Sequence, residues 1–294
     1  MNVAGIICEY NPFHSGHAVH IAQTRAALGE NCAIVCCMSG NFVQRGEFAV
    51  MSKHARAESA ILCGADLVTE LPLPYALSSA ERFALGGVRA LDALGVCGYI
   101  SFGSESGDIQ RLRAAALARG TQRAEEIIRR SLAGGASYAA SLCAAYREIP
   151  DAAPLSPSAP NDMLGVEYLR AIGATGAKLE PIAILRQRER PGHMQPASAI
   201  RRALISAGAG WEHLMPPAAA DIVKREIAAG RAPVPAFGCE AAALSRLRAL
   251  GRDEYLSLPG ASDGAGERLM RFALREPTLR AIAHGAKTKR YVMS

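Results

Sequence analysis

The sequence predicts an α/β protein with a doubly wound, five-stranded parallel sheet, a helical insertion and a helical C-terminal region. Through the first 105 residues, short apolar runs rich in β-branched residues alternate with longer Ala-, Leu- and Arg-rich stretches, which is the pattern of strands joined by helices. The apolar runs are continuous, as is typical of parallel strands covered by helices on both faces. Beyond about residue 198 the strand signals disappear, so we expect only helices from there on.

The elements follow one another in a simple order. Five apolar runs are the expected strands: residues 3–8, 33–38, 67–71, 98–102 and 181–185. Between the first four strands we expect helices at 17–28, 53–63 and 79–94, and the stretch 108–147 continues as helix with a break at Gly134-Gly135. The Pro- and Ser-rich stretch 150–160 predicts a loop, after which Asn161 or Asp162 is expected to cap the next helix.

Length and composition limit the class of protein. Half of the 294 residues are hydrophobic, which is enough for a sizeable globular core. No apolar stretch approaches about 20 residues and no charged segment precedes the first strand, which argues against a membrane span or a secretory signal and favours the cytoplasm. The eight cysteines form no paired C-x-x-C pattern, so we interpret them as buried, reduced thiols and expect no metal site.

Positive charge is concentrated in the second half of the chain. The formal charge of +6 and the pI near 9.0 permit a polyanionic partner without requiring one. The chain ends in a basic block that contains Lys287, Lys289, Arg290 and Tyr291. Lysine, arginine and an aromatic ring together suit phosphate neutralisation and base stacking, although a solvated basic tail would have the same composition.

The strongest chemical signal is the motif His14-Ser15-Gly16-His17, which follows the first expected strand and its turn and leads into a helix. A helix N-terminus at this sheet edge offers free N–H groups and a positive dipole end to phosphates. Two imidazoles three residues apart can stabilise charge that develops on a phosphorus under attack, so His14 and His17 are the expected catalytic pair. A helix-capping pair without a ligand is the alternative. Neither a P-loop nor a G-x-G-x-x-G motif is present.

Polar residues also follow the second expected strand. Gln44 and Arg45 lie in a polar loop and are expected on the substrate side, with an ordinary solvated loop as the alternative. Lys53 and Arg56 open the next helix against its dipole. This arrangement indicates either an anion contact or an exposed charge pair with Glu58.

Further candidates lie at the ends of the fourth and fifth strands and in the helix that follows. Gly103 ends the fourth strand, where it would let a flat ring lie on the backbone. Arg186 ends the fifth strand and offers a guanidinium fork at the same edge. Ser198 is the expected N-cap of the following helix, and together with Arg201 it forms a second candidate phosphate site. Simple turn and capping roles are the alternatives for Gly103 and Ser198.

Taken together, these blocks closely resemble the bacterial tRNA(Met) cytidine acetate ligase family. The similarity rests on residues 9–17, 38–47, 64–72, 102–105 and 287–291 and extends over nearly the whole chain. It implies a Rossmann-like sheet of the HUP nucleotidylyltransferase superfamily. It further implies an enzyme that joins ATP and acetate into acetyl-adenylate, releases pyrophosphate, and acetylates N4 of the wobble cytidine of elongator tRNA(Met). The expected cofactors are ATP and Mg²⁺, and the expected partners are acetate and elongator tRNA(Met).

The same resemblance implies where the ligands bind. The expected ATP contacts are Ile7, Cys8, Glu9, Tyr10, Asn11, Pro12, Phe13, His14, Ser15, Gly16, His17, Ala18, Val19, His20, Gly103, Asn161, Arg186 and Gln187. The expected tRNA contacts are Lys287, Lys289 and Arg290. Residues 1–197 are the expected ATP-binding domain, with the insertion at about 108–150, and residues 198–294 are the expected basic, helical tRNA-binding region.

Two features depart from the family pattern. The segment after Arg186 lacks the Gly- and Tyr-containing loop that we expect there, and the chain stops at Ser294 where relatives continue with more basic helices. If the residues that bind tRNA lie in that continuation, adenylation survives and acetyl transfer fails.

Two alternatives stay open: a small-molecule nucleotidylyltransferase or acyl-adenylating synthetase without an RNA substrate, and a non-enzymatic nucleotide-sensing or RNA-binding module. The oligomeric state is left open.

Overall fold

The computed structural model describes residues 1–136, 138–148, 159–186, 197–235, 238–258, 261 and 264–286. Within these residues, five parallel strands form one sheet in the order β3-β2-β1-β4-β5. The strands are β1 (Val3–Cys8), β2 (Ala33–Ser39), β3 (Leu67–Leu71), β4 (Tyr99–Ser104) and β5 (Glu180–Leu185). The predicted sheet is confirmed. Its strand order reverses between β1 and β4, the position at which open α/β sheets bind ligands.

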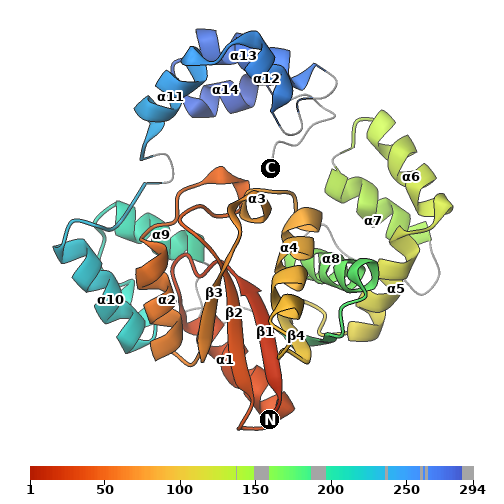
Figure 1. Cartoon of the computed structure of the whole chain (residues 1–294), viewed down its shortest axis with the longest axis vertical. Helices are drawn as coiled ribbons and strands as arrows, with labels where there is room; N and C mark the ends of the chain where they lie inside the picture. Colours follow the sequence, from red (N-terminus) through yellow and green to blue (C-terminus); the bar gives the residue numbers. More distant parts are fainter. Residues whose placement is uncertain are drawn as a thin grey trace.

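Helices cover both faces of this sheet (Figure 1). α1 (Ser15–Leu28) and α2 (Lys53–Leu62) pack on one face, where Ile6 and Cys36 point into the core. α3 (Leu73–Ala76) and α4 (Ala80–Ala93) cover the other face, where Ile7 and Cys37 point into a second core. Because successive strand residues point to opposite faces, neighbours such as Ile6 and Ile7 are both buried, and this explains why the strands are continuously apolar.

The segment between β4 and β5 is helical. It contains α5 (Ile109–Arg119), α6 (Gln122–Ala133), α7 (Tyr138–Glu148) and α8 (Pro160–Thr175). α6 ends at the expected Gly134-Gly135 break. The expected cap of α8 is wrong, because Ala159 is the N-cap residue and Pro160 takes the first helical position. Proline is favoured there since its missing N–H would have no partner within the helix, so Asn161 and Asp162 fall inside the first turn.

The helices after β5 form two groups (Figure 1). α9 (Ala197–Ile205), the short 3-10 helix η2 (Glu212–Leu214) and α10 (Pro217–Ala228) pack on the face that α1 and α2 cover, with Ile200 and Ile222 buried in that core. A second group surrounds a small core of its own that contains Leu244, Tyr255, Ala273 and Ile282. It consists of α11 (Glu240–Ala249), α12 (Arg252–Ser257), α13 (Ala265–Arg275) and α14 (Leu279–Ala286).

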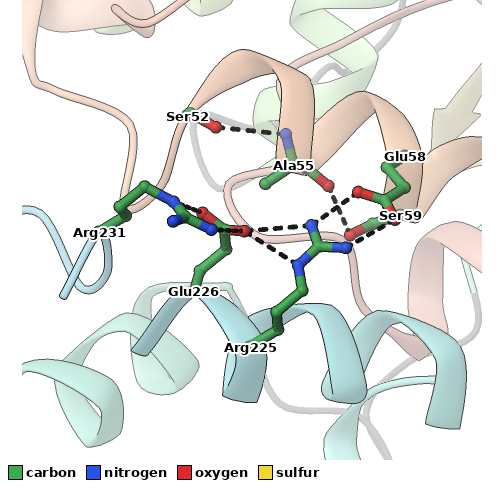
Figure 2. Close-up of polar contacts among 7 residues, drawn as sticks. All are labelled: Ser52, Ala55, Glu58, Ser59, Arg225, Glu226 and Arg231. Atoms are coloured by element: carbon green, nitrogen blue, oxygen red, sulfur yellow. Dashed lines mark hydrogen bonds and ion pairs between the residues drawn. The ribbon is translucent and has the colours of Figure 1, made fainter. Parts of the chain in front are cut away.

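Charged side chains fasten α10 to α2 (Figure 2). Arg225 donates two hydrogen bonds to the carboxylate of Glu58 on α2, at 2.8 and 2.7 Å, and two to Glu226, at 3.1 Å each. Arg231 donates to both oxygens of Glu226, at 2.7 and 2.8 Å. These hydrogen bonds, from Arg231 first and then Arg225, lower the pKa of Glu226 to about 2. Glu58 is therefore paired with α10, and the expected pairing with Arg56 is wrong.

The structure also bears on the expectations about membrane spans and cysteines. Among the residues that the structure describes, no helix combines the length and the apolar character needed to cross a bilayer. The eight cysteines are free thiols: Cys32, Cys36, Cys37 and Cys143 are buried, and Cys239 is exposed.

Candidate active site

A cavity of about 1010 Å³ opens at the carboxyl edge of the sheet, beside the ends of β1, β4 and β5 and the start of α1. This size lies at the upper end of the range for small-molecule sites, about 300 to 1,000 Å³. The expected ATP contacts that line it are Ile7, Cys8, Glu9, Tyr10, Asn11, His14, Gly16, His17, Val19, His20, Gly103, Asn161 and Arg186. Pro12, Phe13, Ser15 and Ala18 are not among the lining residues, and Ser15 instead donates to the carbonyl of Leu214 at 2.9 Å.

His14 and His17 cap α1 with their ring nitrogens. Nδ1 of His14, the N-cap residue, accepts the backbone N–H of Gly16 at 3.0 Å, and Nδ1 of His17 accepts the backbone N–H of His14 at 3.2 Å. The two rings stack with their centroids 3.8 Å apart. Because each Nδ1 is an acceptor, each neutral ring carries its proton on Nε2. The capping and ligand-binding interpretations are thus compatible, since both rings cap the helix and both retain an Nε2–H donor.

Burial keeps these two rings neutral. Burial, and then the nearby cations Arg186 and Arg201, lower the pKa of His14 to about 4. Burial also lowers the pKa of His17 well below its ordinary value, with further contributions from His14, His20 and Arg186. A neutral imidazole can donate its Nε2–H to a developing oxyanion without giving up the proton.

A third histidine, His20, lies one turn further along α1 and also lines the cavity. Its Nε2 lies 2.9 Å from Oγ of Ser101 on β4, and that oxygen lies 2.7 Å from Oγ1 of Thr24. Thr24 in turn donates its hydroxyl proton to the carbonyl of His20 at 2.9 Å. Burial, followed by Arg186, lowers the pKa of His20 to about 4. The three side chains form one hydrogen-bonded chain between α1 and β4.

Two carboxylates join the loop after β4 to the first turn of α8. Glu105 accepts the backbone N–H groups of Asn161 and Asp162, at 3.2 and 2.8 Å, and the side-chain amide of Asn161 at 2.5 Å. In return, Asp162 accepts the backbone N–H groups of Glu105 and Ser106, at 3.0 and 3.3 Å, and the hydroxyl of Ser104. Glu105 therefore caps α8 from a distant segment, which places Asn161 at the cavity.

Two arginines flank the histidines. The backbone N–H of Arg186 donates to the carbonyl of Ser104 at 2.8 Å, and a Cβ at Gly103 would come within 3.2 Å of Arg186 Cγ. The glycine therefore leaves room for the stem of this arginine, and its contact with a flat ring stays a prediction. Arg201 on α9 lines the cavity and donates to the carbonyl of Asn11 at 2.7 Å, which ties α9 to the loop before His14.

Ser198 does not have the expected position in its helix. α9 begins at Ala197, so Ser198 lies within the helix and the predicted N-cap role is wrong. Ala197 and Arg201 line the cavity and Ser198 is not among the lining residues. Among the described residues, the second candidate phosphate site therefore consists of Arg201 alone.

Of the polar residues that follow β2, Gln44 lines the cavity and Lys53 pairs with another side chain of the protein. Gln44, in the 3-10 helix η1 (Gln44–Gly46), lines the cavity, and its backbone N–H donates to Glu9 at 2.6 Å. Arg45 lies in the same short helix, and its side chain is outside the described part of the structure. Lys53 pairs with Glu70 at 2.5 Å, so the expected anion contact of Lys53 is taken by a carboxylate of the protein.

Arg56 is a buried side chain that holds together the loops around the site. It is 0% exposed, and its guanidinium donates to four backbone carbonyls, those of Glu9, Ser39, Gly40 and Met51. The expected anion contact and surface charge pair of Arg56 are both wrong, because its donors are used inside the protein. This single side chain joins the loops that follow β1 and β2 to the turn before α2.

Sequence reasoning missed several polar residues that line the cavity, among them Gln23 on α1, Arg111 on α5 and Tyr168 on α8. Gln23 had a detectable signal, since it continues the three-residue spacing of His14, His17 and His20. The other two have no local signal, because the insertion brings them to the cavity only in the folded chain. The predicted residues Gln187, Lys287, Lys289 and Arg290 lie outside the described part of the chain.

The carboxylates at the cavity do not form a metal site. Among the described lining residues, Glu9, Glu105 and Asp162 each accept backbone N–H groups. The described part of the chain also holds no group of three or more His, Cys, Asp or Glu side chains arranged for a metal ion. A protein-held Mg²⁺ therefore does not fit these residues, whereas Mg²⁺ bound chiefly by nucleotide phosphates needs few protein ligands.

Comparison with known proteins assigns the whole chain to one protein family. Residues 1–294 match the HIGH Nucleotidyl Transferase family. The chain is 43% identical over 234 residues to the tRNA(Met) cytidine acetate ligase of Syntrophotalea carbinolica, a match that covers 76% of this chain and 55% of that protein. It is 34% identical over 307 residues to the protein of the same name from Acetivibrio thermocellus, with 99% of this chain and 74% of that protein covered. The chain thus spans only part of these relatives.

A solved structure has the same fold. Thermotoga maritima TmcAL, crystallised with bound alpha-thio ATP, superposes with a TM-score of 0.88 and is 34% identical, over 100% of this chain and 72% of that one. Its apo form superposes with a TM-score of 0.87. The described fold is therefore one that binds an ATP analogue in that protein.

Proposed function

We propose that this chain, which belongs to the HIGH Nucleotidyl Transferase family and within it to the tRNA(Met) cytidine acetate ligases, uses ATP to activate acetate and then acetylates a cytidine of tRNA(Met). The observation that carries the proposal is the pair of Nε2–H donors on His14 and His17 at the N-terminus of α1. Arg186 and Arg201 lie beside this pair in the same cavity. Such a cluster of neutral donors and cations suits a nucleotide whose α-phosphorus is attacked.

In the first step, a carboxylate oxygen of acetate attacks the α-phosphorus of ATP. An O–P bond forms, the bond from the α-phosphorus to the oxygen shared with the β-phosphate breaks, and pyrophosphate leaves. Negative charge grows on the non-bridging oxygens of the five-coordinate phosphorus. His14 and His17 donate their Nε2–H groups to these oxygens, and the dipole of α1 adds to the stabilisation. Arg186 and Arg201 supply positive charge for the departing pyrophosphate. This step needs orientation and electrostatics more than a proton transfer.

In the second step, the exocyclic N4 amine of the cytidine attacks the acetyl carbonyl carbon. The C–O bond to the phosphate of AMP breaks, AMP leaves with the bonding electron pair, and the amine releases one proton to the solvent. The base has to leave its stack to reach the mixed anhydride. We assign Lys287, Lys289 and Arg290 to the tRNA contacts, and we assign Mg²⁺ to the phosphates of ATP, where it would neutralise their charge.

The packing of the helices suggests how these tasks are divided. α9 and α10 share the core of the sheet, so the proposed ATP-binding unit extends past residue 197 to the end of α10. α11 to α14 have their own core and carry exposed arginines such as Arg271 and Arg275 on α13. We propose that the tRNA-binding region begins with these four helices.

Acetate-dependent exchange of labelled pyrophosphate into ATP tests the first step, and transfer of labelled acetate to tRNA(Met) tests the second. We expect exchange that requires acetate, and transfer that is lost with a tRNA whose wobble cytidine is replaced. Exchange that does not depend on acetate would favour a nucleotidylyltransferase acting on another small molecule. Absence of exchange under any condition would overturn the activation of acetate, and exchange without transfer would mean that residues 1–294 by themselves do not position tRNA(Met) for the second step.

A further inference from the structure

The three histidines of α1 differ in the hydrogen-bonding role that the fold assigns to them. In His14 and His17, Nδ1 accepts a backbone N–H and the free ring nitrogen is a donor. His20 is bonded through the other nitrogen, because its Nε2 meets Ser101. Within the described part of the chain, Nδ1 of His20 has no hydrogen-bond partner. The direction of the bond to Ser101 therefore decides whether His20 is a donor or an acceptor toward the cavity.

With all three contacts taken as hydrogen bonds, a count of the available protons gives that direction. Thr24 has one hydroxyl proton and donates it to the carbonyl of His20. Its contact with Ser101 must then use the proton of Ser101. Ser101 has no second proton, so its contact with His20 requires an N–H on the ring. His20 is therefore the Nε2–H tautomer, and its Nδ1 carries a lone pair.

The hydrogen-bonded side chains of His20, Ser101 and Thr24, here called the relay, lie largely in the interior of the protein. Thr24 is 0% and Ser101 is 1% exposed, and the two residues lie on different elements, α1 and β4. Because both hydroxyls are buried, each needs a partner inside the protein, which keeps the three contacts together. Burial and Arg186 also keep the His20 ring neutral, which preserves the lone pair at neutral pH.

We propose that Thr24 and Ser101 are positioning residues that make His20 Nδ1 an acceptor in the cavity, and that this nitrogen takes a hydrogen bond from the nucleoside of ATP. The assignment to the nucleoside rests on the proposed function and on chemistry. Ionised phosphates offer only acceptors, whereas the ribose hydroxyls and the adenine amino group are donors. His20 also lies about 4.5 Å from His17 and about 9 Å from His14 along the helix axis, away from the phosphate end.

Imidazole NMR tests the relay by itself. Long-range proton–nitrogen spectra of the wild-type chain at neutral pH should show His20 Nδ1 as the unprotonated nitrogen. Ser101→Ala and Thr24→Val should move its shift toward the average of a free imidazole. Matched controls are Ser59→Ala and Thr175→Val, whose hydroxyls also bond a helix carbonyl, at 2.9 and 2.7 Å, away from His20. A protonated Nδ1 in the wild type, or unchanged spectra in both relay variants, would overturn the relay.

Binding of ATP analogues tests the nucleoside contact. Affinities of ATP, 2′-deoxy-ATP, 3′-deoxy-ATP and the purine analogue without the amino group are compared in wild type, His20→Phe and His20→Asn. One analogue should bind the wild type about 3- to 10-fold more weakly than ATP. His20→Phe should bind that analogue and ATP equally, and His20→Asn should keep part of the preference. Losses that are the same in wild type and His20→Phe for all three analogues overturn the assignment, while a wild-type chain that binds no ATP overturns the proposed function with it.

Discussion

His14 donates its backbone N–H to Nδ1 of His17, and the two rings stack 3.8 Å apart. The pair that we assign to the α-phosphate therefore also closes the first turn of α1. The conformation of the helix end and the direction of the two Nε2–H groups are set by the same hydrogen bonds. Substitutions that preserve the cap can separate the chemical role from the structural one.

His14→Asn should separate these roles, because asparagine is a strong N-cap residue but lacks the Nε2–H donor. We expect pyrophosphate exchange to fall by about 100-fold or more, which is typical for the loss of an oxyanion donor. The free energy of unfolding, measured with urea, should change by less than about 0.5 kcal/mol, whereas His14→Ala should lower it by about 1 kcal/mol. Exchange at the wild-type rate in His14→Asn would remove His14 from the catalytic pair.

Glu105 and Asp162 should behave as one unit. Glu105→Ala removes the cap of α8, and Asp162→Ala leaves two backbone N–H groups and a hydroxyl without their partner, so each should lower the free energy of unfolding by about 1 to 3 kcal/mol. The double variant should lose less than the sum by about 1 kcal/mol, because the contacts are shared. Thr121→Ala, which removes the separate cap of α6, should instead be additive with Glu105→Ala. Additivity of the Glu105 and Asp162 variants would contradict this coupling.

Arg56→Met should destabilise the protein by about 3 kcal/mol, since four buried carbonyls lose their donor. ATP affinity should fall as well, because the loop at Glu9 loses its support. The control is Arg89→Met, at an exposed position on α4, which should change stability by less than about 0.5 kcal/mol. Arg56→Lys should recover only part of the loss, because one ammonium group cannot reach all four carbonyls. Full recovery in Arg56→Lys would mean that charge alone matters at this position.

The buried histidines should make the protein less stable toward mild acid. His14 and His20 have a pKa of about 4 in the fold, against an ordinary value of 6.5. The unfolded chain therefore binds protons that the folded chain does not, so stability falls as pH drops from about 6.5 to about 4, by up to about 1.4 kcal/mol per pH unit for each histidine. Urea unfolding across this range should show a shallower pH dependence for His14→Asn. An equal slope in wild type and variant would place the acid sensitivity elsewhere.

Much of the site could be predicted because its signals are local. The His14 to His17 motif lies on a contiguous segment that follows a strand, so the sheet edge and the helix start were both visible in the sequence. Arg186 and Gly103 were found for the same reason, as residues at strand ends. Arg56 was misinterpreted because a helix-opening arginine has the same sequence signature whether it faces a ligand, the solvent or buried carbonyls.

The sequence by itself determined the parallel sheet, its helical insertion and the histidine motif at the sheet edge, since apolar periodicity and strand-end residues depend on a few neighbouring positions. Only the tertiary structure decided that Glu105 caps α8, that Arg56 is internal, and that His20 is bonded through Nε2 whereas His14 and His17 are bonded through Nδ1. Each of these depends on hydrogen bonds between segments far apart in the chain, such as His20 with Ser101. The direction of a hydrogen bond is set by the partners that folding brings together, and no local pattern encodes those partners.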